Sequence, residues 1–208
     1  MGICNRTGTQ EIGQHNFAGH DAIAISGRSP WMAAARAHAS HGHLDDFNQE
    51  HEALFARRGI PLDDPPHPRR LAANWGRPIC RSPHHRSFIP EFLSNLAEMH
   101  GITISTIGAR LKPGELVDAI VAPLDIQYKA ADLTGIALIC GDSSEPPRTE
   151  LTGATAPLPV DAHQMRHLMY TAKLLAHLAR DLHFPNPHRN GLGKVFDELL
   201  PGAIHFQI

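Results

Sequence analysis

The 208-residue sequence lacks the features that mark several large classes of protein. Lys and Arg number 19 against 21 Asp and Glu, so the chain has no basic surplus of the kind that drives binding to duplex nucleic acid. No apolar run approaches the roughly 20 residues that a transmembrane helix needs, and the N-terminus lacks the charged-then-apolar profile of a signal peptide. These absences predict a soluble cytoplasmic protein with neither duplex nucleic acid as a partner nor a transmembrane segment.

Cysteine and glycine patterns exclude two further kinds of site. The three cysteines form no CxxC pair and leave an odd number, which suits a reducing compartment. NGLGK at 190–194 lacks P-loop spacing and a preceding strand, so no phosphate loop is predicted. MGICNRT places Gly2 and Cys4 where acylation occurs, but Arg6 stands where N-myristoylation requires Ser or Thr. A plain terminus is therefore favoured over a lipidated one.

Length and a hydrophobic content of 42% favour one domain over residues 1–208. The chain shows no internal repeat. The alternative is a division into a helical-hairpin region at 1–60, a Pro-rich connecting segment at 61–87, and an α/β core at 88–208.

A helical hairpin is predicted near the N-terminus, after a strand at DAIAIS. Ser29 and Pro30 open a helix that stops near His41, with Gly42 after its end. Asp46 then caps a second helix, which ends at Gly59 and carries His51 among its apolar residues.

The remainder of the chain alternates helices with strands. Helices are predicted at 90–100, 113–123 and 161–183 and shortly after residue 194, and strands at 102–106, 134–140 and 203–208. The predicted fold class is therefore α/β or α+β, with a mixed or mainly parallel sheet of about four to five strands and helices packed on it. The helix at 161–183 is amphipathic, and its stripe from Met165 to Leu182 is either core or a partner interface.

Histidine is the one residue type in clear excess. Sixteen histidines nearly equal the lysines and arginines together, and histidine is the commonest metal ligand. The densest group is HASHGHLDDFNQEH, residues 38–51, which a hairpin would fold together. Three or four such nitrogen and oxygen ligands suit zinc or another divalent ion. The candidate metal ligands here are His38, His41, His43, Asp45 and His51.

Helix-end chemistry is the alternative interpretation of this group. A helix dipole favours His38 and His41 in a last turn, and Asp46 has a role as a cap, so three of the polar residues need no metal. His163 and His167, at i and i+4 of the long helix, form a second candidate metal pair.

HGHLDD resembles the HxHxDH signature of the metallo-β-lactamase family, in which histidines and an aspartate bind metal. His41, His43 and Asp45 match the signature, Asp46 replaces its last histidine, and Asp142 in LICGDSS could match the family's later aspartate. The resemblance covers these residues alone and implies a metal-dependent hydrolase. The helix predicted before the motif departs from the strand that the family has there.

LICGDSS also places Asp142 and Ser143 in a loop after an apolar strand, where open α/β sheets bind ligands. The GDS triplet resembles the first block of GDSL-type hydrolases, in which the serine is the nucleophile. The family's later DxxH has its nearest counterpart at 181–183, one residue short. A simple turn capped by Asp142 is the alternative.

Two functions remain open from the sequence. The first is a metal-dependent hydrolase of a small-molecule or peptide-like substrate, with zinc or a similar ion on the histidines and with Asp142 and Ser143 near the substrate. The second is a ligand-sensing or protein-binding module that forms a homodimer through the helix at 161–183 and performs no catalysis.

Overall fold

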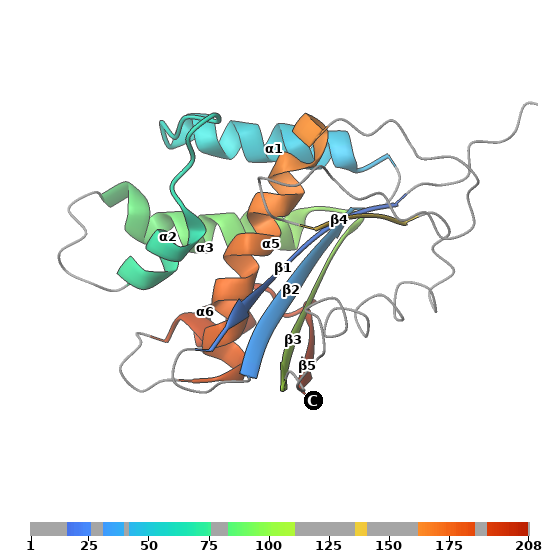
Figure 1. Cartoon of the computed structure of the whole chain (residues 1–208). Coiled ribbons are helices and arrows are strands. Elements are labelled where there is room, and N and C mark those ends of the chain that lie inside the picture. The colour runs from blue at the N-terminus through green and yellow to red at the C-terminus, as the bar shows by residue number, and fades with distance from the viewer. Residues whose placement is uncertain are drawn as a thin grey trace, which may run out of the picture.

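A five-stranded mixed sheet forms the centre of the molecule (Figure 1). The computed structural model describes residues 16–25, 31–39, 42–75, 83–110, 136–140, 162–185 and 191–207. The strand order is β4-β1-β2-β3-β5, and the central strand β2 runs antiparallel to both of its neighbours. β4 pairs with β1 and β5 pairs with β3, both in parallel. The class is α+β, and the mixed sheet agrees with the prediction. The strands are β1 (Asn16–Ala24), β2 (Trp31–Ala39), β3 (Ile102–Arg110), β4 (Ile136–Cys140) and β5 (Ile204–Gln207).

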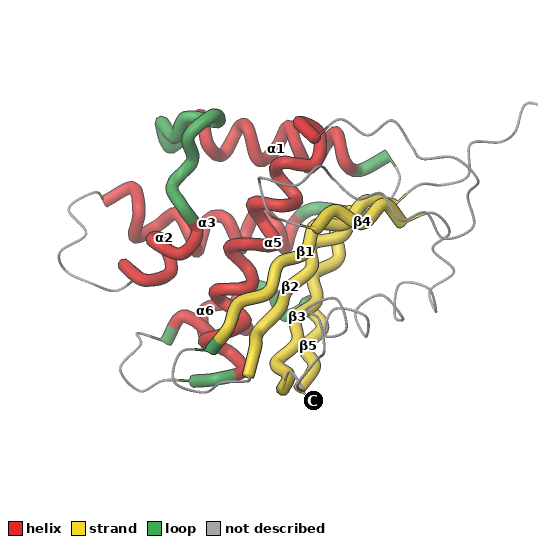
Figure 2. Tube along the Cα trace, in the orientation of Figure 1, coloured by secondary structure: helices red, strands yellow, loops and turns green. Residues whose placement is uncertain are grey.

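The described helices are α1, α2, α3, α5 and α6, and Figure 2 shows them gathered on one side of the sheet. α5 lies directly on the strands and contacts β1, β2 and β3. None of the described helices is long and apolar enough to cross a membrane. The helix bounds are α1 (Leu44–Arg57), α2 (Pro68–Asn74), α3 (Pro83–Glu98), α5 (Ala162–His183) and α6 (Leu192–Leu199).

The predicted helical hairpin is wrong in its first half, because WMAAARAHA forms strand β2. Alanine favours helices when a segment stands alone. Here β1 and β3 supply hydrogen bonds to both edges of the segment, and its side chains alternate between the two faces of the sheet. One face carries four completely buried alanines, and the other carries larger and polar residues. Tertiary pairing therefore overrides local propensity. The buried alanines of the first face are Ala33, Ala35, Ala37 and Ala39, and Ala34 is buried on the other face.

The second half of the predicted hairpin corresponds to α1. It begins at Leu44, so Asp46 lies inside its first turn rather than at its cap, and Gly59 follows its end at a φ of 60°. Leu54 and His51 are buried, as the pattern indicates.

The Pro-rich connecting segment contains helices that were not predicted. α2 begins at Pro68, whose missing N–H costs nothing in a first turn, and the His67 side chain accepts a hydrogen bond from the Arg69 N–H. α3 begins at Pro83, well before the predicted start at residue 90. The predicted helix at 113–123 lies outside the described residues.

α5 provides much of the core. Leu168, Ala172, Leu175 and Ala179 are completely buried, so these four residues of the stripe proposed as a dimer interface pack inside the chain. Two glycines of the sheet allow the close approach. A Cβ at Gly19 would lie 2.7 Å from the backbone carbonyl of Leu168, in the absence of any rearrangement.

Gly19→Ala should therefore destabilise the fold. The added methyl group meets backbone atoms of α5, which cannot rotate away, so we expect a loss of about 1 to 3 kcal/mol in the free energy of unfolding, measured in urea. Gly202→Ala is the matched control, because nothing lies within 4 Å of its Cβ position. Equal stabilities of the two variants would contradict the packing of α5 on β1.

Candidate functional site

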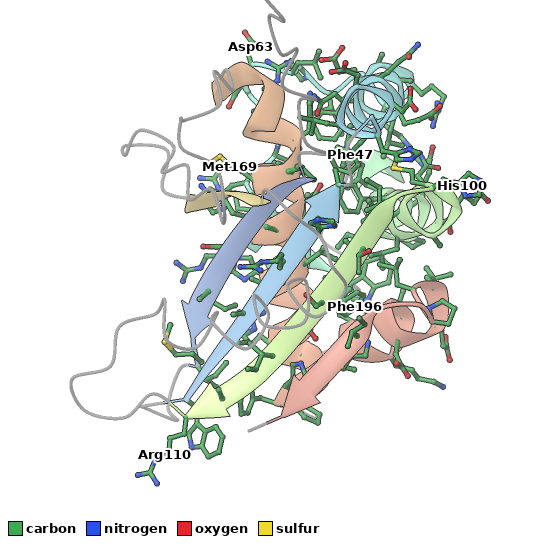
Figure 3. All side chains as sticks on the ribbon, turned by 90° about the vertical axis from the view of Figure 1, so that its right-hand side faces the viewer. Phe47, Asp63, His100, Arg110, Met169 and Phe196 are labelled. Atoms are coloured by element: carbon green, nitrogen blue, oxygen red, sulfur yellow. The ribbon has the colours of Figure 1, made fainter. Side chains whose placement is uncertain are left out.

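Polar residues occupy the face of the sheet opposite α5, which Figure 3 turns toward the viewer. Along β2, the side chains of Met32, Ala34, Arg36 and His38 alternate with the alanines that face α5. Arg36 is completely buried, and His38 is 1% exposed. Ser105 on β3 is the register partner of Arg36 and is also buried. We call Arg36, His38 and Ser105 the polar sheet face.

The electrostatics of the polar sheet face keep its histidine neutral. Burial, followed by the charge of Arg36, lowers the pKa of His38 to about 4. At neutral pH the imidazole therefore retains a nitrogen lone pair, which is the form that binds a metal or accepts a proton.

The register connects this face to the end of β4. Cys140, the last residue of β4, pairs with His20 of β1, and His20 pairs with Arg36. A single row across the sheet thus runs from Cys140 to Ser105. The predicted catalytic residues Asp142 and Ser143 follow Cys140 by two and three residues and lie outside the described residues.

A second polar group lies between α1 and α5. The rings of His51 and His167 stack with centroids 5.6 Å apart and an angle of 10° between their planes. His51 Nε2 lies 3.4 Å from the Thr171 hydroxyl, and its Nδ1 has no hydrogen-bond partner among the described residues. Burial lowers the pKa of His51 to about 3, helped by His167.

His167 connects the buried pair to the surface. Its Nε2 lies 3.3 Å from Oε1 of Glu52. The same Nε2 accepts a hydrogen bond from the Nε–H of Arg166, also at 3.3 Å. One nitrogen cannot donate to Glu52 and accept from Arg166 at once, so the proton position of His167 selects between them. Hydrogen bonding to His167 is the main cause that lowers the pKa of Glu52.

A third polar group joins β3, β5 and α5. The Thr106 hydroxyl lies 2.8 Å from Nε2 of His183 and 2.7 Å from Nδ1 of His205, whose Nε2 is 3.8 Å from Oδ1 of Asp197. The order carboxylate, imidazole, hydroxyl resembles a nucleophile with its base. The Thr106 hydroxyl of β3 bonds both His183 of α5 and His205 of β5, so the group fastens β5 and the end of α5 to β3. Asp181, the GDSL-like candidate partner of His183, accepts a hydrogen bond from the Nε–H of Arg180.

A pocket of about 380 Å³ lies where the start of α1, the end of α3 and the start of β3 meet. Figure 3 labels two of its lining residues, Phe47 and His100. His43, at the position preceding α1, also lines it.

The predicted metal ligands are distributed over these separate places. His38 lies on the polar sheet face, His51 and His167 stack together on the helical side, and His43 lines the pocket. Asp45 is exposed in the first turn of α1. No group of three or more His, Cys, Asp or Glu residues with metal-site geometry occurs in the described part of the chain. His41 and the side chain of His163 lie outside it.

Sequence reasoning did not identify Arg36 and Ser105 as site residues. The available signal was the single charged residue in AAARAHA, which becomes informative only when the segment is assigned to a strand. A buried charge costs several kcal/mol unless its surroundings compensate it, so a charged residue inside a strand is an informative signal once the strand is known to be central.

The comparisons with known proteins found no relative. No protein-family model, curated protein or solved structure matches this chain. The function must therefore be inferred from the residues themselves.

The low pKa of His51 predicts acid sensitivity. Because its folded pKa of about 3 lies below the unfolded value of 6.5, the unfolded chain binds more protons as the pH falls below 6.5. The stability that the neutral ring provides is complete above pH 6.5 and is lost progressively toward pH 3. Each unit between the two pKa values is worth about 1.4 kcal/mol.

Urea unfolding between pH 4 and pH 7 tests this sign. The double variant His51→Leu with Thr171→Val, which removes the ring and its hydroxyl partner together, should lose less stability on acidification than the natural chain. His100→Gln, at an exposed position, is the control and should keep the natural slope. An unchanged slope in the double variant would contradict the assignment.

Proposed function

We propose that this chain is a metal-dependent hydrolase of small anionic molecules, with its active site on the polar sheet face. The observation that carries the proposal is the burial of Arg36 beside the neutral His38 on the central strand. An arginine held in a low-dielectric environment binds carboxylate or phosphate groups strongly, and a neutral imidazole binds zinc or acts as a base. The substrate would present its anionic group to Arg36.

The row across the sheet supports a role for Asp142 and Ser143. An extended chain spans at most about 3.6 Å per residue, so the Cα atom of Asp142 is at most roughly 7 Å from that of Cys140. Arg36 lies two strands from Cys140, or about 10 Å at the usual strand spacing. A long arginine side chain and a loop carboxylate can meet over such a distance. Asp142 would complete the metal site or act as the base, and Ser143 would bind or attack the substrate.

The metal would need ligands in addition to His38. His38 has the donor chemistry that zinc prefers, but the described residues supply no second or third ligand beside it. The remaining ligands would come from residues such as Asp142. A bound divalent ion would lower the pKa of a coordinated water and so supply the hydrolytic nucleophile.

Metal content tests this part directly. The untagged protein, purified without chelator, should carry about one equivalent of a divalent ion by elemental analysis, and His38→Gln and Asp142→Asn should each remove it. His100→Gln, which lies away from β2, should retain the metal. Absence of metal from the natural protein, together with no thermal shift on adding zinc or manganese, would exclude a metal-dependent reaction.

Hydrolysis of p-nitrophenyl acetate and p-nitrophenyl phosphate tests the role of Arg36. Arg36→Lys keeps the charge but removes the two-pronged hydrogen bonding, so we expect it to raise KM for the phosphate ester about tenfold and to change acetate hydrolysis little. His38→Gln should lower kcat for both esters by roughly 100-fold or more. Equal kinetics in the natural chain and in a folded His38→Gln variant would remove the polar sheet face from catalysis.

The second candidate function is ligand sensing without catalysis. The pocket beside α1 supports it, because its volume falls in the usual range for small-molecule sites. A protein that binds a small molecule there, carries no metal and cleaves neither ester would favour sensing over hydrolysis.

A further inference from the structure

The pocket at the start of α1 has an apolar wall with charged groups of one sign around it. Phe47, Met99 and Ile102 provide hydrocarbon surface, and Phe47 is almost completely buried. Asp46 and Glu50 enter the lining from α1, one helical turn apart, and Glu98 enters from the end of α3. Among the described residues, the lining contains no Lys or Arg.

These three carboxylates differ from two other acidic side chains of the same helices, Glu52 and Glu91. Glu52 of α1 is paired with Arg166, and Glu91 of α3 is paired with Arg58. Asp46, Glu50 and Glu98 have neither an ion pair nor a hydrogen bond from their side chains among the residues that the structure describes. Within the described part of the chain, the pocket therefore gathers three carboxylates that have no ion-pair partner.

The spacing of the carboxylates favours an extended ligand over a metal ion. Side chains at i and i+4 of a helix, such as Asp46 and Glu50, have Cβ atoms about 6 Å apart, and Glu98 approaches from a different helix. No three acidic or histidine side chains in the described ranges converge on one point as metal ligands do. A ligand with two or more positive groups separated by a hydrocarbon chain satisfies both the separated charges and the apolar wall.

We propose that this pocket binds an aliphatic polyamine, with its ammonium groups against Asp46, Glu50 and Glu98 and its methylene chain along Phe47 and Met99. The site is distinct from the polar sheet face, because its lining includes none of Arg36, His38 and Ser105. The inference therefore does not depend on the hydrolase assignment, and it gives a ligand class to the sensing function. His43 and His100 in the lining provide spectroscopic probes of occupancy.

Calorimetric titration with spermidine tests the proposal on the full-length protein. We expect one binding site, and we expect Glu50→Gln combined with Glu98→Gln to weaken binding at least tenfold. Both residues are exposed, so the double variant should keep the natural melting temperature within a few degrees. Asp63→Asn combined with Asp64→Asn is the matched control, because it removes two exposed acidic groups from the loop beyond the far end of α1 (Figure 3).

Two further measurements separate a specific site from general attraction between charges. In NMR spectra, spermidine should shift the imidazole signals of His43 and His100, and 1,8-diaminooctane should bind while the neutral 1,8-octanediol does not. Equal weakening in the two double variants, or spermidine binding that leaves both histidine signals unchanged, would overturn the proposal. Equal binding of the diol would show an apolar ligand site without cation selectivity, and no binding at 5 millimolar spermidine would exclude the polyamine altogether.

Discussion

The close contact between α5 and the sheet is the constraint on which the other features of this structure depend. The 22-residue helix can approach three strands this closely only where the strand side chains beneath it are very small. Gly19, Gly108 and the buried alanines of β2 meet that requirement. The contact also buries Leu168, Ala172, Leu175 and Ala179 of the apolar stripe of α5.

Strand geometry then determines where the polar residues lie. Alternate side chains of β2 point to opposite faces of the sheet. The alanines at odd-numbered positions from 33 to 39 face α5, so residues 36 and 38 lie on the other face. An arginine and a histidine become neighbours on the central strand without any further requirement. The same alternation on β3 sends Thr106 toward His183 of α5 and Ser105 toward the polar sheet face.

Histidine has different roles in different parts of this chain. Buried at the α1–α5 contact, His51 packs against aromatic rings and bonds a threonine, as a core residue does. His183 of α5 and His205 of β5 both hydrogen-bond the Thr106 hydroxyl of β3. At the pocket, His43 is half-buried beside carboxylates. The described histidines therefore occupy several structural environments, and among them only His38 combines burial, a lowered pKa and a neighbouring charge on a central strand.

The sequence by itself determined the elements whose period and boundary residues agree, such as α1 ending before Gly59, the apolar strand β4, and α5 with its repeating stripe. It also indicated that His51 lies on a buried face. It could not identify WMAAARAHA as a strand, because alanine fits a helix locally and only hydrogen bonds from β1 and β3 decide otherwise. The position of His38 depends on that decision, since a helix end would have placed it near His43, whereas the strand places it beside Arg36. Local propensity acts over a few residues, but a sheet joins residues 20, 36, 105 and 140, and only the tertiary structure brings such distant positions into one row.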